Sequence, residues 1–148
     1  MKILGYDKYK LVNEKIKADY RDLLSKSDFI SFHVPLTEET KGMLDVEQLP
    51  LLKRGVFIIN VSRGEVVSIP ALLEGLDKGI IAGVGLDVVS HEPPETSEEK
   101  RLVSDPRVIV TPHVAGSTEE AEEQAVRMAC STLQKLWSEE NDDDASLS

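Results

Sequence analysis

Charged and titratable side chains follow the apolar segments of this chain at short distances. Arg63 comes three residues after the segment that ends at Asn60, Glu92 comes 29 residues after Arg63, and His113 comes 21 residues after Glu92. A planar guanidinium can bind a carboxylate through two parallel hydrogen bonds. Imidazole gains and loses a proton near neutral pH, and a neighbouring carboxylate stabilises its charged form. Residues of these types could therefore bind an organic acid and move a proton.

The apolar segments that would position these side chains are short and continuous. They are rich in Val and Ile, which is typical of parallel strands that are covered on both faces. We predict strands at Ile3–Leu4, Phe29–Val34, Val56–Asn60, Ile80–Leu86 and Val108–Val110.

Helical segments lie between and after these strands. The first covers Asp45–Leu52, and the second covers Pro70–Leu76, with proline at its start and Gly79 after its end. The third begins at Ser117, where Glu120 completes the pattern of a capping box. Its apolar residues have helical spacing and predict a buried stripe of Val126, Ala129, Cys130, Leu133, Leu136 and Trp137. The alternation of strands and helices predicts an α/β fold with a mostly parallel sheet.

Ligands of open α/β sheets bind beyond the carboxyl ends of the strands, and the polar segments lie there. They follow the five predicted strands in order: Asp7, then His33–Thr37 with Thr40 and Gly42, then Asn60–Gly64, then Asp87–Pro93, then Thr111–Gly116. In this order and spacing they resemble the D-isomer-specific 2-hydroxyacid dehydrogenases, most of all the phosphoglycerate dehydrogenase branch. The resemblance runs from Met1 to about Trp137. It implies a Rossmann-like, doubly wound parallel sheet that is incomplete.

The resemblance implies a catalytic set. Arg63 would bind the carboxylate of a 2-hydroxy or 2-keto acid and polarise the neighbouring carbonyl. His113 would be the general acid and base that exchanges a proton with the substrate oxygen. Glu92 would orient the imidazole and raise its pKa. The hydride would come from the cofactor, so the protein would supply placement and electrostatics.

The same resemblance implies that the cofactor is NAD. Asp7 would accept hydrogen bonds from the adenosine ribose, and an acid there disfavours the 2′-phosphate of NADP. Asp87 would hold the nicotinamide carboxamide. Gly116 would allow a close approach of backbone to cofactor. The nicotinamide end would be lined by the loops that contain Val61, Ser62, Arg63, His113 and Gly116.

Simpler interpretations of these residues are open at this point. Arg63 could be a surface arginine, His113 a loop histidine that caps the following helix, and Asp7 a solvated turn aspartate. A shift of alignment would replace Glu92 as the carboxylate partner by one of its neighbours Glu95, Glu98 and Glu99.

Four further residues are expected to have structural or peripheral roles. We expect His33 to be a structural residue at a strand end near the cofactor cleft and His91 to face solvent. Cys130 and Trp137 are expected to pack in the core.

The G-x-G-x-x-G loop that opens the family's nucleotide domain is not found in this sequence, and neither is the family's substrate domain. We therefore expect residues 1–140 to form a partial NAD-binding domain and residues 141–148 an acidic disordered tail. In the strand order 3-2-1-4-5-6 the missing strand is central, so the strands near Ile3 and Val56 would each lose a neighbour. Two classes of function are consistent with this pattern. One is an NAD-dependent oxidoreductase or a fragment of it, and the other is a non-catalytic NAD-sensing or interaction module, or an inactive truncated product.

Composition limits the partners. The chain has 17 basic and 27 acidic residues and a net charge of -10, which disfavours nucleic acids and anionic membranes. One cysteine excludes an internal disulfide and a multi-cysteine zinc site, and we predict no metal. No segment has the pattern of a signal peptide or a membrane span, so we expect a cytoplasmic protein. The expected partner is a small 2-hydroxy or 2-keto acid, and the full-length family is expected to form homodimers.

Overall fold

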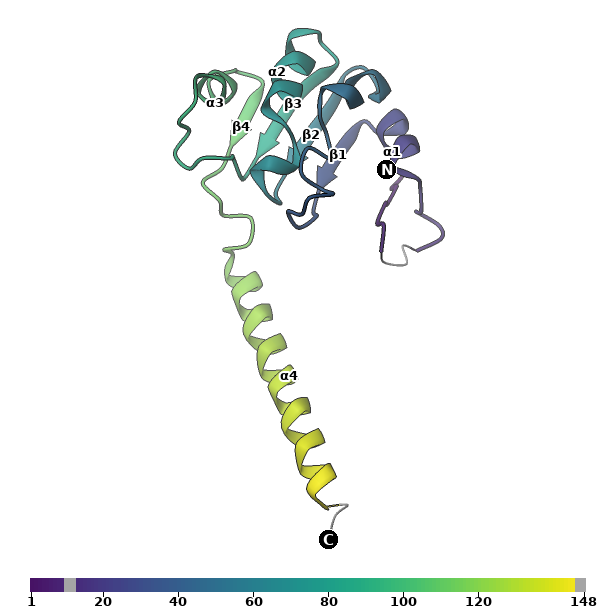
Figure 1. Cartoon of the computed structure of the whole chain (residues 1–148), viewed down its shortest axis with the longest axis vertical. Helices are drawn as coiled ribbons and strands as arrows, with labels where there is room; N and C mark the ends of the chain where they lie inside the picture. The colour runs from purple at the N-terminus through teal and green to yellow at the C-terminus, as the bar shows by residue number, and fades with distance from the viewer. Residues whose placement is uncertain (10–12, 146–148) are drawn as a thin grey trace. The chain divides into compact units, whose positions relative to one another are not determined.

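The computed structural model describes residues 1–9 and 13–145 of the chain (Figure 1). The chain divides into two compact units, Met1–Pro112 and His113–Ser148, and each is described by itself. The first unit contains the sheet and the predicted site residues up to Asp87 and Glu92. The second contains His113 and Gly116.

Four parallel strands form the sheet of the first unit. β1 (Phe29–Phe32), β2 (Val56–Asn60), β3 (Ile81–Leu86) and β4 (Val108–Val110) pair in the order in which they occur in the sequence. Each corresponds to a predicted strand, so the α/β, Rossmann-like parallel sheet is confirmed. Because the strands are parallel, their carboxyl ends meet at one edge, toward which the arrows in Figure 1 point.

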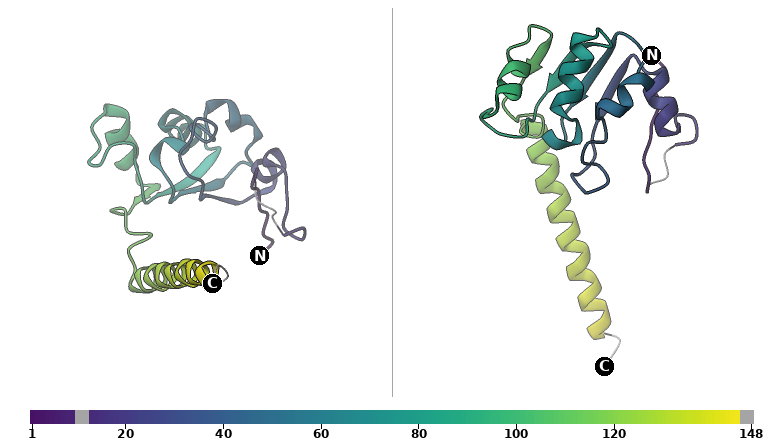
Figure 2. Two further views of the ribbon diagram at one scale, coloured as in Figure 1. Left: turned by 60° about the horizontal axis from the view of Figure 1, so that its bottom comes forward. Right: turned by 45° about the horizontal axis from the view of Figure 1, so that its top comes forward.

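One face of the sheet carries the core. Ile30, Ile58 and Val84 stand side by side on neighbouring strands and are all buried. The helix α2 (Ile69–Asp77) and the 3-10 helix η1 (Val46–Leu51) pack together over the sheet (Figure 2). Both were predicted at nearly these bounds. Ser68 caps α2 by accepting the N–H of Ala71.

Side chains on the opposite face are exposed, although the apolar runs predicted strands covered on both faces. Phe29 is 62% exposed and Ile109 is 71% exposed. Phe29 stacks on Phe57 with ring centroids 5.0 Å apart, and each ring shields part of the other. The apolar composition of a strand shows that both of its faces prefer burial, but the burial itself depends on which other segments lie nearby.

The predicted strand at Ile3–Leu4 does not join the sheet. Gly5 pairs with Lys17 in an isolated bridge, in which the Gly5 N–H donates to the Ile16 carbonyl at 2.7 Å. Two apolar residues before a glycine are shorter than an ordinary strand. The expectation that Val56 would lie beside a missing strand is also wrong, because β2 pairs with both β1 and β3. Among the described strands, those with a single partner are the two edge strands, β1 and β4.

Two short helices were not predicted. The helix α1 (Tyr20–Lys26) begins after Asp19, whose carboxylate accepts the N–H of Asp22, and it buries Leu24 completely. The helix α3 (Ser97–Val103) begins with a capping box formed by Thr96 and Glu99. Both have mostly polar sequences, so their starts are marked by capping residues and not by apolar periodicity.

The second unit contains the long helix α4 (Glu119–Ala145). It begins two residues after the predicted start at Ser117, since the Thr118 hydroxyl accepts the N–H of Ala121. Residues 141–145, which we predicted as a disordered tail, continue this helix, because extending an existing helix costs far less than starting one. Residues 146–148 lie outside the described residues. None of the helices in the described part of the chain has the length and apolar character needed to cross a membrane.

The predicted burial of the α4 stripe is wrong for the members that the structure describes. Val126, Leu133 and Trp137 are exposed, Trp137 to 71%, and Cys130 is exposed as well. Cys130 and Trp137 are therefore not core residues of this unit. Helical periodicity identifies the apolar side of a helix, but it does not identify what covers that side.

We predict that Gly75→Ala in α2 destabilises the first unit although alanine is the better helix former. A Cβ there would lie 2.4 Å from Cδ1 of the buried Ile81. Helix propensity favours alanine by about 1 kcal/mol, whereas overpacking costs roughly 1–3 kcal/mol. We therefore expect a lower urea midpoint for the variant.

Gly85→Ala in β3 is the control for this experiment, because its Cβ would meet a single atom of Ile59 at 3.9 Å. A Gly75→Ala protein as stable as the wild type would contradict the packing described between α2 and β3.

Candidate functional site

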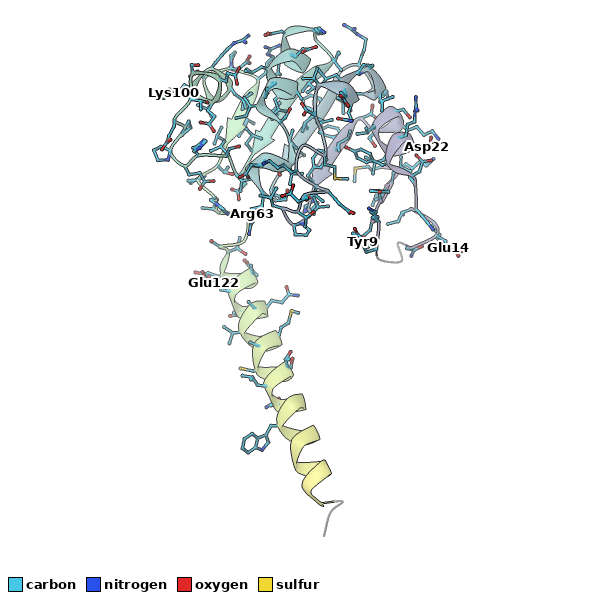
Figure 3. The ribbon with its side chains drawn as sticks, viewed as in Figure 1. Tyr9, Glu14, Asp22, Arg63, Lys100 and Glu122 are labelled. Atoms are coloured by element: carbon cyan, nitrogen blue, oxygen red, sulfur yellow. The ribbon has the colours of Figure 1, made fainter. Side chains whose placement is uncertain are left out.

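A shallow cleft of about 610 Å³ opens at the carboxyl ends of β1 and β2. It is lined by His33, Val34, Pro35, Leu36, Val61, Ser62 and Arg63. Arg63 lies at the edge of the sheet toward which the strands point (Figure 3). The Ser31 hydroxyl and Nε2 of His33 are 2.8 Å apart. His33 therefore lies at a strand end beside the cleft, as expected from the sequence.

The turn that presents Arg63 is built on Asn60, the last residue of β2. Asn60 is 1% exposed, and its Oδ1 accepts the backbone N–H of Ser62 at 3.1 Å and the Ser62 hydroxyl at 2.8 Å. Its side-chain amide donates to the Arg63 carbonyl at 2.8 Å. One buried amide thus satisfies three polar groups of the turn. The Arg63 side chain is exposed, and its Nη1 donates to the Ser62 carbonyl at 2.7 Å.

Asp87 connects the next two strand ends. Its backbone N–H donates to the Asn60 carbonyl at 3.0 Å, and its buried carboxylate accepts the Thr111 hydroxyl. The Thr111 N–H donates to the Leu86 carbonyl at 2.9 Å. The residues that follow β2, β3 and β4 are therefore held together at one edge. Asp87 lies there, as predicted.

Gly64 brings the Arg63 turn against the loop that carries Glu92. A Cβ on Gly64 would lie 2.4 Å from the carbonyl carbon of Val89 and 2.5 Å from the nitrogen of Ser90. These are backbone atoms, so they could not move aside as a flexible side chain does. The two backbones approach this closely because residue 64 has no side chain. The turn that carries Arg63 and the loop that carries Glu92 are therefore in direct backbone contact.

Glu92 is exposed, and its Oε1 accepts the N–H of Val89 at 3.4 Å. Of the alternative carboxylates, Glu95 and Glu98 are also exposed, whereas Glu99 is buried and paired with His91, whose Nδ1 lies 2.7 Å from Oε1. The His91 side chain is half-exposed. It therefore faces solvent on one side, as expected, and contacts Glu99 on the other, which was not expected.

Asp7 lies in a turn near the start of the chain. Its Oδ1 accepts the N–H of Tyr9 at 2.9 Å, and the neighbouring Lys8 forms an ion pair with Glu39 at 2.8 Å. This geometry is consistent with the interpretation of Asp7 as a solvated turn aspartate. The contact of Asp7 with a ribose stays a prediction.

His113 and Gly116 belong to the second unit. Among the described residues, His113 alone of the non-glycine residues has a positive φ, of 55°. Residues other than glycine rarely adopt a positive φ, although histidine does so more often than most. Strained backbone of this kind is concentrated at active sites, which is consistent with a functional role of His113. A Cβ on Gly116 would meet nothing within 4 Å.

Several residues that shape this site were not predicted from the sequence. Asn60 and Thr111 lie in the polar segments after their strands, but no role was predicted for either of them, and the His91–Glu99 pair was not predicted. A signal for Asn60 was present, because a polar residue at the end of an apolar strand needs partners when it is buried.

Comparison with known proteins places this geometry among characterised dehydrogenases. The family described as D-isomer specific 2-hydroxyacid dehydrogenase, NAD binding domain, has a model that matches residues 1–115. D-3-phosphoglycerate dehydrogenase 1 of Saccharomyces cerevisiae is 42% identical over 130 residues, a match that covers 81% of this chain and 28% of the yeast protein. Glyoxylate reductase of Thermococcus litoralis is 41% identical over 138 residues, covering 90% of this chain and 41% of that protein.

Solved structures agree with these matches. D-lactate dehydrogenase from Aquifex aeolicus, complexed with NAD and lactic acid, superposes with a TM-score of 0.74 and 32% identity, and the match covers 93% of this chain and 46% of that one. The chain thus spans less than half the length of each of these three relatives.

We predict that Asn60→Asp destabilises the protein and loosens the turn at residues 61–64. Aspartate keeps an acceptor for Ser62, but it places a carboxylate oxygen where the amide donates to the Arg63 carbonyl. Loss of a buried hydrogen bond of this kind costs roughly 1–3 kcal/mol, which thermal unfolding would measure.

Asn13→Asp is the matched control for this substitution. Asn13 is exposed, and its Oδ1 accepts the N–H of Lys15, a bond that aspartate retains. Equal stability of the two variants would show that the Asn60 amide does not hold the turn.

Proposed function

Since the chain belongs to the D-isomer-specific 2-hydroxyacid dehydrogenases, within their NAD-binding domain, we propose that it supplies the nicotinamide end of an NAD-dependent oxidoreductase that interconverts a 2-hydroxy acid and a 2-keto acid. The family and its cofactor, NAD, were both predicted from the sequence and are confirmed. The observation that carries the proposal is the backbone contact at Gly64, which sets the Arg63 turn beside the Glu92 loop at the carboxyl edge of the sheet.

In the proposed reaction Arg63 binds the substrate carboxylate. Its guanidinium has five N–H donors, and one of them donates to the Ser62 carbonyl, an interaction that orients the side chain next to the cleft. The fork of donors matches a carboxylate, and its positive charge also polarises the neighbouring keto group.

In this proposal His113 carries the proton and Glu92 supports it. When bound, NADH supplies the hydride that reduces the carbonyl carbon. The imidazolium of His113 donates its proton to the carbonyl oxygen as the hydroxyl forms, and the reverse reaction returns that proton to the imidazole. Glu92 stabilises the protonated ring and fixes its orientation.

Several residues of the chain would hold NAD, and some of them follow the ends of strands β2 and β3. Val61 and Ser62 line the cleft, and Asp87 would accept hydrogen bonds from the nicotinamide carboxamide. Asp7 would bind the ribose hydroxyls and repel a 2′-phosphate, which favours NAD over NADP. Gly116, with open space around its α-carbon, would let the backbone approach the cofactor.

We extend the proposal to the partners and location of the protein. The substrate is a small 2-hydroxy or 2-keto acid, the complete enzyme is a cytoplasmic homodimer, and nucleic acids and membranes are not partners. The net charge of -10 supports the last point, because anionic surfaces repel an acidic protein.

Fluorescence titration with NADH tests the proposal directly. We predict saturable binding of NADH and binding of NADPH that is weaker by roughly tenfold, which corresponds to about 1.4 kcal/mol. Asp7→Asn should narrow this difference because it removes the repelling charge. Absence of NADH binding at millimolar cofactor would favour an inactive product, and NADH binding without turnover of any 2-keto acid would favour a sensing module.

We also predict that Arg63→Lys weakens the binding of a short 2-keto acid such as pyruvate to the NADH complex, by about 10- to 100-fold. Lysine keeps the charge but loses the two-pronged contact, a difference of roughly 1–3 kcal/mol. Quenching of NADH fluorescence by the keto acid measures this. Arg54→Lys, at the opposite end of β2, is the control and should leave the affinity unchanged.

A further inference from the structure

Glu99 is a buried carboxylate that the proposed chemistry does not use. Its side chain is 1% exposed and lies in the first turn of α3. One carboxylate oxygen accepts the backbone N–H groups of Glu95 and Thr96, both at 2.9 Å. The other lies 2.7 Å from Nδ1 of His91. Every one of these partners belongs to the segment that leads into α3 from the carboxyl end of β3.

These contacts exceed what the start of a helix requires. The capping box of α3 is complete when Thr96 accepts the Glu99 N–H, at 3.1 Å, and Glu99 accepts the Thr96 N–H. The bonds to His91 and to the Glu95 N–H are additional. They hold positions 91 and 95, and Glu92 lies between these two positions.

We propose that Glu99 is a positioning residue, which fixes both ends of the loop at residues 91–95 and thereby holds Glu92 at the carboxyl edge of the sheet. The proposal rests on the proposed function, because the role of Glu92 comes from there. The other fixed point of the loop is Gly64, where the backbone of Val89 and Ser90 packs against the Arg63 turn. The loop is thus held by α3 on one side and by the turn after β2 on the other.

Electrostatics strengthens this arrangement. The hydrogen bond to Glu99 is the main cause that raises the pKa of His91, and the charges of Glu99, Glu95 and Glu65 add to it. The His91–Glu99 contact is therefore an ion pair below the pKa of His91. As pH rises through that pKa, the ion pair becomes a hydrogen bond between a neutral imidazole and the Glu99 carboxylate, and the hold on the loop weakens.

The test uses Glu99→Gln, because glutamine can still complete a capping box while the negative charge is lost. Glu98→Gln is the matched control: it removes the same charge from the same helical turn at an exposed side chain. Backbone ¹⁵N relaxation and amide exchange report the mobility of residues 91–95. Side-chain NMR titration of the three histidines gives the pKa of His91.

In Glu99→Gln we expect a lower pKa of His91, faster motion at His91 and Glu92, and exchange of the Glu95 amide that is faster by roughly tenfold, the scale of one lost charge-assisted hydrogen bond. Glu98→Gln should match the wild type. In the wild type, loop motion should increase as pH rises through the pKa of His91, and in Glu99→Gln this dependence should be absent.

A loop at residues 91–95 that moves no faster in Glu99→Gln, with change confined to the first turn of α3, would overturn the proposal and leave Glu99 as a helix cap alone. If circular dichroism shows that Glu99→Gln does not fold, His91→Gln takes its place, since it leaves the capping box intact. It should mobilise the loop and abolish the pH dependence, and a loop unchanged in that variant would equally overturn the proposal. None of these readouts needs NADH, so a loop that loosens in a protein without cofactor binding would refute the proposed function and not the role of Glu99.

Discussion

The carboxyl edge of the sheet depends on polar groups that are buried where the strands end. Asn60, at the end of β2, satisfies Ser62 and Arg63, and its carbonyl accepts the N–H of Asp87 beyond β3. Asp87 in turn accepts the hydroxyl of Thr111 beyond β4. A buried polar group without a partner costs roughly 1–3 kcal/mol, and among the described residues every buried side-chain nitrogen and oxygen has a partner. These bonds therefore fix where each following loop begins.

The loops gain their positions from this edge and from one close backbone contact. Arg63 comes three residues after Asn60, and the hydrogen bonds of the Asn60 amide fix the position of the turn that carries Arg63. The loop after β3 then packs against Gly64 so closely that a side chain at position 64 would clash with its backbone. An arginine and a carboxylate from distant parts of the sequence thus share one region through packing and hydrogen bonds between main chains. The side chains themselves remain exposed, as groups that must meet a ligand have to be.

The parts of this structure that were predictable from the sequence are those where local pattern and global packing agree. Continuous runs such as Val56–Asn60 predicted parallel strands, and the proline before Ala71 predicted the start of α2. The polar helices α1 and α3 have no apolar period to reveal them. The order of strands was misjudged for Val56, because pairing is a long-range property that the composition of one strand does not contain.

The candidate site was predictable to a similar extent. The positions of Arg63, Asp87 and Glu92 follow from the rule that ligands of such sheets bind beyond the strand ends. The supporting groups were missed because their role appears only when distant segments meet. His91 and Glu99 are eight residues apart, and neither a strand nor a helical period relates them. The burial of Glu99 could not be anticipated either, since an acidic residue in a helix of polar composition is ordinarily solvated.

Glu99 and His91 respond to pH in opposite directions, and this limits the conditions under which the Glu92 loop is held most firmly. Backbone hydrogen bonds, first of all from Thr96, outweigh the effect of burial and lower the pKa of Glu99 to about 2. A group with a lowered pKa stabilises the fold above its unfolded value, near 4.3, and that contribution is lost as pH falls toward the folded value. The raised pKa of His91 has the reverse consequence: its contribution is complete below about pH 6.5 and is lost as pH rises through the folded value. Both contributions are complete from about pH 4.3 to about pH 6.5, so the loop is held most firmly in that window. As pH rises through the raised pKa of His91, the carboxylate alone continues to hold Glu95 and Thr96.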